Sequence, residues 1–139
     1  MGRGGRVDLR QLKAFERKLA KLATADYEKF CEDCAKELAA RLLGKVIRRT
    51  PVAKVDGGTL RRGWTIGQVK KSGSVYEIEV INPVEYAQYV EFGHRTSNHQ
   101  GWVNGRFMMT ISADQVEQQA PAVLERKLYT LLRETFDGD

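Results

Sequence analysis

Residues Asn82–Thr96 read N-P-V-E-Y-A-Q-Y-V-E-F-G-H-R-T, and the rest of the chain can be arranged around this stretch. Three of the ten Tyr and Phe residues of the chain, Tyr86, Tyr89 and Phe92, fall within seven of its positions. Aromatic side chains bury a large apolar area, so a dense group of them is typical of a core anchor or an interface. Glu91 stands inside the group, where a carboxylate without a partner would be costly if it were buried.

The spacing of this stretch fits a short helix and also a strand. Tyr86, Tyr89 and Val90 share one helical face, whereas apolar residues at even positions between Val84 and Phe92 share one strand face. We favour the helix, because Pro83 suits a first helical turn.

We expect the stretch to anchor the junction between a sheet and a helix. The residues predicted to form this anchor are Tyr86, Tyr89, Val90, Glu91, Phe92 and Gly93. Glu91 is expected to pair with an arginine, either Arg95 or Arg106, which are nearest in the sequence. An exposed Glu91 without a partner would contradict this role.

Upstream of the stretch the apolar pattern is helical. Residues 1–7 read as a flexible basic arm, and a single domain is expected over residues 8–136. Asp8 is a suitable N-cap for a first helix. Steps of three and four along its apolar stripe predict an amphipathic helix, and the stripe consists of Leu9, Leu12, Phe15, Leu19 and Leu22.

A second helix is predicted after a cap at Thr24 or Asp26, although one continuous helix through this region is equally compatible with the pattern. It should end near Thr50, because Pro51 disfavours the α conformation in the residue before it. Its stripe consists of Tyr27, Phe30, Cys31, Cys34, Leu38, Leu42 and Val46.

Pro51–Gly63 is predicted to be a long mobile loop, since D-G-G at 56–58 is strong turn chemistry. Basic residues flank the turn, and four residues of this region are expected to face a partner or DNA: Lys54, Arg61, Arg62 and Trp64. Trp64–Ile81 then predicts an antiparallel hairpin that turns at Ser72-Gly73-Ser74. Tyr76, Ile78 and Val80 alternate on one side, while Val69 breaks the alternation of the first strand.

A second mobile loop is expected near residues 93–104, because Gly93–Gly101 is polar. Trp102–Met109 is predicted to add a strand with a bend at Gly105. Ser112 has capping-box spacing to Gln115, so a C-terminal helix is predicted from there to about Phe136. Pro121 should either kink this helix or start its second part. The predicted fold class is α+β: N-terminal helices, a small antiparallel β-sheet, and a C-terminal helix packed on the sheet.

Composition limits the possible functions. The 139 residues suit one domain with a modest core, and 42% apolar content is too low for a membrane protein. No apolar run approaches the ~20 residues that span a bilayer, and no apolar segment follows the basic N-terminus. The net charge of +5 divides into +8 over residues 1–63 and −3 over residues 64–139. Such a division indicates either a nucleic-acid face or contacts between oppositely charged surfaces.

The chain offers little that could carry catalysis or bind a metal. Cys31 and Cys34, with His94 and His99, are ligand types that zinc prefers. The cysteines lie in a periodic helical stripe, however, where Cys acts as a small core side chain. No nucleophile motif, metal motif or phosphate loop occurs in the sequence, so we expect no enzyme, no cofactor and no metal.

The order of short motifs resembles that of tailed-bacteriophage head–tail joining and tail-completion proteins, which are neck or minor tail components. The motifs are T-P at 50–51, G-T-L-R-R-G-W at 58–64, Y-A-Q-Y-V-E-F-G at 86–93 and G-R-F-M at 105–108. The third matches the family pattern in full. Gly63 stands where the family usually has Ser, and the last motif lacks a Pro. The order of the motifs, with the helices and strands between and after them, covers most of residues 45–135.

The resemblance implies a non-enzymatic virion protein, made in the host cytoplasm, that assembles as a ring of six between the head connector and the tail. It also implies contacts with the tail terminator or tail tube, contact with DNA passing through the ring, and no membrane association. The alternative from the residues themselves is a small nucleic-acid-binding module carried by the basic first half. A zinc or redox protein using Cys31 and Cys34 is a third, weaker possibility.

Overall fold

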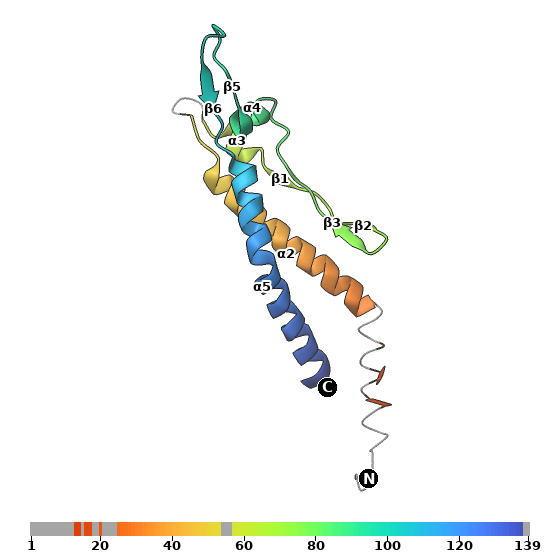
Figure 1. Ribbon diagram of the computed structural model, residues 1–139. Helices are drawn as coiled ribbons and strands as arrows, with labels where there is room; N and C mark the ends of the chain where they lie inside the picture. The colour runs from red at the N-terminus through yellow and green to blue at the C-terminus, as the bar shows by residue number, and fades with distance from the viewer. Residues whose placement is uncertain (1–12, 15, 18–19, 21–24, 54–56, 138–139) are drawn as a thin grey trace.

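Two long helices form the frame of the molecule. The computed structural model describes residues 13–14, 16–17, 20, 25–53 and 57–137. Helices α2 (Ala25–Arg49) and α5 (Met108–Asp137) run in opposite directions and pack against each other (Figure 1). The described positions between 13 and 20 are helical, as predicted, whereas the basic arm lies outside the described residues. The α+β class is confirmed.

The apolar stripes of the two helices make the small core. Val46 of α2 and Met108 of α5 are 0% and 1% exposed, and burial of such a side chain stabilises a fold by about 1.5–3 kcal/mol. Helix α2 ends at Arg49, before Pro51, as predicted. The other buried hydrophobic residues in the described part are Cys34, Ala39, Leu60, Val116 and Val123.

The hairpin predicted over Trp64–Ile81 is confirmed as an antiparallel ribbon. Strand β1 (Thr65–Ile66) pairs with β4 (Val80–Ile81), and β2 (Lys70–Ser72) pairs with β3 (Val75–Glu77). Three residues separate β1 from β2 but only two separate β3 from β4, so the first arm carries one extra residue, as in a β-bulge. The break in alternation that the sequence shows at Val69 falls within this bulge.

The ribbon lies against α2. Tyr76, Ile78 and Val80 are half-buried there, which is the face that the alternation predicted. At the far end of the ribbon, Lys71 Nζ lies 2.8 Å from Glu28 Oε1 of α2.

Two segments predicted as loops contain regular structure. Thr59–Arg62 forms a short helix, α3, within the predicted 51–63 loop, because Leu60 is buried against the end of α2. The polar 93–104 segment forms a hairpin of β5 (Gly93–Arg95) and β6 (Trp102–Asn104) that extends beyond the helices (Figure 1). The predicted strand at 102–109 therefore ends at Asn104. The mobility expected of both segments stays a prediction.

The helix favoured for the opening stretch is confirmed as α4 (Ala87–Phe92). Helix α5, by contrast, begins at Met108, four residues before the predicted start. Ser112 is fully buried inside α5, and its Oγ has no hydrogen-bond partner in the described structure, so the expected capping box is not formed. Pro121 lies within α5, which continues through it as one helix.

Candidate functional site

Glu91 holds the junction between α4 and α5. Its side chain is 7% exposed, and its carboxylate accepts hydrogen bonds from the start of α5. Oε1 lies 2.8 Å from the backbone N of Met109, and Oε2 lies 2.8 Å from the backbone N of Thr110 and 2.7 Å from its Oγ1. The first backbone N–H groups of a helix lack partners within the helix and carry partial positive charge, so a carboxylate there is strongly favoured. Glu91 therefore caps α5 from a different helix.

The expected partner of Glu91 is thus wrong, although the expectation that it is partnered is confirmed. Arg95 and Arg106 are both exposed, and neither forms an ion pair with it in the described structure. The partner of Glu91 Oε2 is instead Thr110, a residue that no sequence pattern indicated.

The backbone reinforces the same junction. The N–H of Arg106 donates to the carbonyl of Val90 (2.8 Å), and the N–H of Phe107 donates to that of Glu91 (3.0 Å). Gly93 leaves α4 with φ +90°, and a Cβ there would lie 2.5 Å from the carbonyl oxygen of Val103. Only glycine fits this conformation without strain. The end of α4 and the beginning of α5 are thereby fixed to each other.

The aromatic rings of the stretch do not lie in the core. Tyr86 is 44% exposed, and Tyr89 and Phe92 are each 60% exposed, so the rings are not a core anchor of the single chain. Their predicted role at the junction between sheet and helix stays a prediction. Val90 is half-buried. The anchoring is done by Glu91 and by the backbone at Gly93, because the short α4 turns its carboxylate inward and its rings outward.

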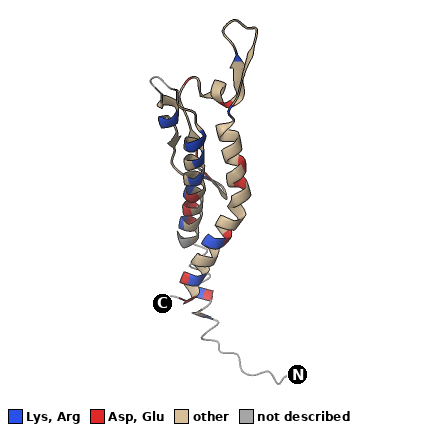
Figure 2. Ribbon diagram, turned by 90° about the vertical axis from the view of Figure 1, so that its left-hand side faces the viewer, with Lys and Arg blue, Asp and Glu red and all other residues tan. Residues whose placement is uncertain are grey.

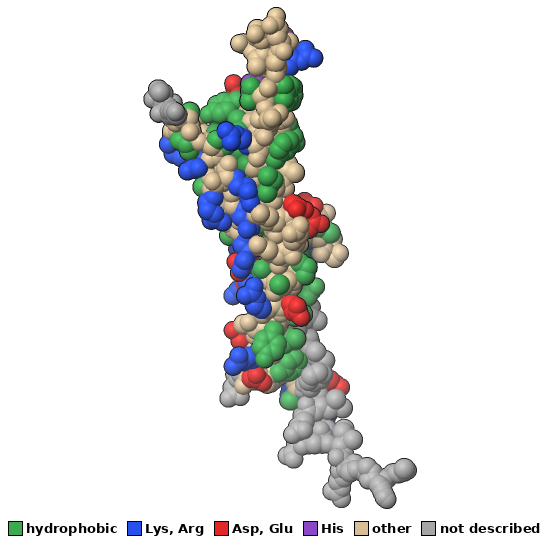
Figure 3. All heavy atoms as spheres, turned by 60° about the vertical axis from the view of Figure 1, so that its left-hand side comes forward, with side chains coloured by type: hydrophobic (Ala, Val, Ile, Leu, Met, Phe, Trp, Pro, Cys, Tyr) green, Lys and Arg blue, Asp and Glu red, His purple; other side chains and the backbone are tan. Residues whose placement is uncertain are grey.

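These rings belong to a larger exposed surface at the hairpin end of the molecule, which we call the apical surface. Figure 3 shows hydrophobic side chains gathered below the β5–β6 hairpin. Phe92 and Phe107 meet edge to face, with ring centroids 6.4 Å apart. The exposed members of the apical surface are Tyr86, Tyr89, Phe92, Trp102, Val103, Phe107 and Ile111. The last four were missed from the sequence, where the only signal was an apolar Trp102-Val103 pair after a polar segment.

Two residues of the predicted partner-facing region contact the end of α2. Arg61 donates to the carbonyl oxygen of Thr50 from Nη2 (2.7 Å) and Nε (3.2 Å). Trp64 Nε1 donates to Thr50 Oγ1 at 2.6 Å. A cation suits the carbonyls at the C-terminal end of a helix, so Arg61 stabilises the α2 terminus, while the Trp64 indole holds the Thr50 hydroxyl. Arg62 is exposed, and Lys54 lies outside the described residues; the partner-facing or DNA-facing role of this region stays a prediction.

The cysteines behave as core residues. Cys34 is 8% exposed, Cys31 is half-buried, and both are free thiols. Burial raises the pKa of the Cys34 thiol, an effect that the nearby Lys127 ammonium partly opposes. The described residues contain no group of three His, Cys, Asp or Glu side chains placed to hold a metal ion.

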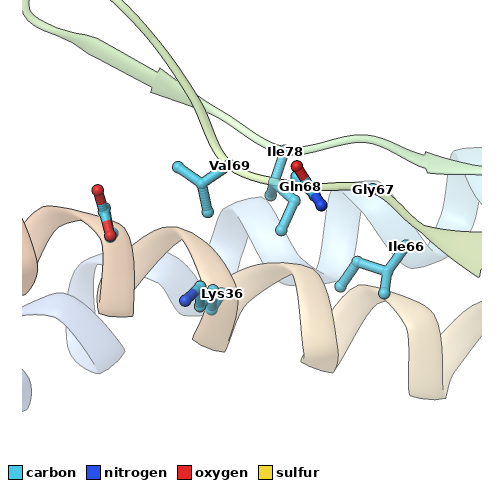
Figure 4. A pocket seen from close by; sticks show the side chains of 7 residues that line it. Lys36, Ile66, Gly67, Gln68, Val69 and Ile78 are labelled. Carbon is cyan, nitrogen blue, oxygen red and sulfur yellow. The ribbon is translucent and has the colours of Figure 1, made fainter.

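A pocket of about 530 Å³ lies between α2 and the bulge of the ribbon (Figure 4). Its charged lining consists of Glu32 and Lys36 of α2 only, and the opposite wall is formed by Ile66, Gly67, Gln68, Val69 and Ile78. One exposed carboxylate and one exposed amine do not make a paired acid and base. The expectation that the chain is not an enzyme stays a prediction.

The fold and its exposed surface define a small α+β subunit suited to contacts with other proteins. The chain belongs to the HK97-gp10-like family, whose model is described as "Bacteriophage HK97-gp10, putative tail-component" and matches residues 13–93. The match spans α2, α3, the ribbon and α4, and it includes the Y-A-Q-Y-V-E-F-G motif. No curated protein and no solved structure gave a match.

Family membership confirms the resemblance to phage tail proteins. It identifies the chain as a member of a bacteriophage tail-component family. Among the described helices, none combines the length and the apolar character needed to cross a membrane.

Proposed function

We propose that the chain is a structural subunit of the phage neck that completes the tail and joins it to the head. It assembles as a ring, expected to have six copies, between the head connector and the tail terminator or tail tube. DNA passes through the ring, and the protein acts in the virion without catalysis. The tail-component family supports the virion setting.

The apical surface is the observation that carries this proposal. In the described part of the chain, fifteen large hydrophobic side chains are exposed and seven hydrophobic side chains are buried. A monomer gains stability from burying such groups, and a cluster of exposed aromatic rings marks a contact with another protein. Seven of the fifteen belong to the apical surface. We therefore expect neighbouring proteins to cover the apical surface in the assembled particle.

Phage assembly tests this proposal. Particles made without the protein should accumulate as DNA-filled heads and separate tails. Supplying the chain with Tyr89→Ser and Trp102→Ser should fail to restore joining, because both side chains lie at the apical surface, 60% and 58% exposed. The matched control is Leu128→Ser with Tyr129→Ser, 46% and 66% exposed on the distal part of α5, which should restore joining.

Two results would count against the proposal. Joined, infectious particles made without the protein would rule out the head–tail joining role. Full rescue by the apical variant, at wild-type protein levels, would show that the apical surface is not the contact.

A further inference from the structure

The two long helices carry opposite charges at the same level of the molecule. From Leu38 to Arg49, α2 has four Lys or Arg residues and no acidic residue. From Met108 to Glu125, α5 has three acidic residues and no Lys or Arg. Because the helices are antiparallel, the C-terminal half of α2 lies beside the N-terminal half of α5.

These charges lie on separate sides of the helix pair. Arg41, Lys45 and Arg48 are spaced by four and three residues, so they share one face of α2, which we call the basic edge. Asp114, Glu117 and Glu125 are all exposed on α5 and form the acidic edge. At this level of the molecule, Figure 2 marks Lys and Arg positions along α2 and Asp and Glu positions along α5, and Figure 3 shows basic and acidic side chains toward opposite sides of one face.

The two edges are not neutralised within the described chain. Within the described residues, the only ion pair formed by either edge joins Arg41 Nε to Glu37 Oε2 at 3.7 Å, with both side chains more than a third exposed. Asp114 accepts a hydrogen bond from the neutral amide of Gln118 (3.1 Å). Like charges at helical neighbours, such as Arg41 and Lys45, repel each other weakly. A surface of opposite charge would remove this repulsion.

We propose that the basic edge of one copy binds the acidic edge of the next copy. The inference rests on the proposed ring and names the contact that would close it. Because the two edges are different and lie on opposite sides, the contact is heterologous. Repeating it gives a ring where the rotation between copies closes, rather than a symmetric pair. Several exposed pairs acting together should make the association fall roughly tenfold or more between low and high salt.

Charge reversal tests the contact on the purified full chain. One variant carries Lys45→Glu with Arg48→Glu, and the other carries Asp114→Lys with Glu117→Lys. In sedimentation at low salt, the wild type should form species larger than a dimer, and each variant alone should be monomeric. An equimolar mixture of the two should associate again, because every edge then meets its opposite.

A chain with all four reversals should also associate, which a misfolded variant would not do. The matched control combines Lys29→Glu with Glu134→Lys, two exposed charges outside the edges, and should behave as the wild type. Circular dichroism of each variant confirms its helix content.

Three outcomes would overturn the inference: a wild type that stays monomeric at every concentration and salt, single-edge variants that associate normally, or a mixture that stays monomeric. Duplex DNA binding lost in the basic-edge variant, with self-association retained, would assign that edge to nucleic acid instead. The assay contains no phage, so its failure is distinguishable from failure of the head–tail joining role.

Discussion

The Glu91 cap gives the sharpest prediction of stability. Glu91→Ala removes a buried carboxylate that accepts three hydrogen bonds, two of them from backbone N–H groups of α5. A helix cap contributes about 0.5–2 kcal/mol, and a hydrogen bond to a charged group contributes about 1.5–3 kcal/mol. Water can hydrate part of the exposed helix end, so the full sum is not lost. We expect a loss of about 3–4 kcal/mol in the free energy of unfolding.

Glu91→Gln separates the charge from the shape. The amide keeps one acceptor oxygen but turns an NH₂ group toward an N–H donor. We therefore expect Glu91→Gln to lower the free energy of unfolding by roughly 2 kcal/mol, about half of the loss in Glu91→Ala. Glu85→Ala is the matched control, because Glu85 is an exposed glutamate six residues earlier. It should change stability by less than about 0.5 kcal/mol.

Urea unfolding followed by circular dichroism measures these differences, and thermal unfolding should show Glu91→Ala shifted down by roughly 10 °C. The reasoning is refuted if Glu91→Ala and Glu85→Ala unfold at the same urea concentration. A change in the slope m of the free energy of unfolding against urea, with an unchanged midpoint, would also contradict the reasoning. The cap acts on the folded state and should lower the midpoint.

Three further predictions concern other parts of the fold. Trp64→Phe removes the indole donor to Thr50 while keeping an aromatic ring, and urea unfolding should show a loss of about 1 kcal/mol. Gly93→Ala should cost about 1–3 kcal/mol more than Gly73→Ala in the same assay, because both have positive φ but only Gly93 also meets backbone atoms; equal costs would mean that the crowding is relieved. In a chain with the other cysteine replaced, Cys34 should react with iodoacetamide roughly tenfold or more slower when folded than in urea. Since burial raises the pKa of Cys34, its contribution to stability is complete below the ordinary thiol pKa and declines as the pH rises above it; stability that increases in that range would contradict this.

Local patterns in the sequence predicted much of the secondary structure. The end of α2 follows from Pro51, the ribbon from its alternation and its Ser-Gly-Ser turn, and the α4 helix from the aromatic spacing, whereas Pro83 lies four residues before Ala87 and outside the helix. Each of these depends on residues a few positions apart, so the sequence contains the whole cause. The motif order was likewise enough to indicate the phage family.

The start of α5 could not be predicted in this way. Its N-terminal partner is Glu91, 18 residues from Met109 and in another helix, whereas the nearby Ser112 offered a plausible but unused cap. A capping interaction between residues that are distant in the sequence produces no periodic pattern in the sequence, so it cannot be predicted from spacing. The same limit applies to Arg61 and Trp64, whose partner Thr50 is known only once the chain has folded back.

The Asn82–Thr96 stretch shows both what the sequence indicates and what only the tertiary structure decides. By itself the sequence favoured a short helix before Gly93, indicated that Glu91 would need a partner if buried, and supplied one of the motifs that resemble the family. Only the tertiary structure decided which side of the helix faces inward. The carboxylate points to the α5 terminus and the rings point to solvent, because a helix end with unpaired N–H groups attracts a negative charge. The rings that dominate the sequence are thereby left exposed at the apical surface.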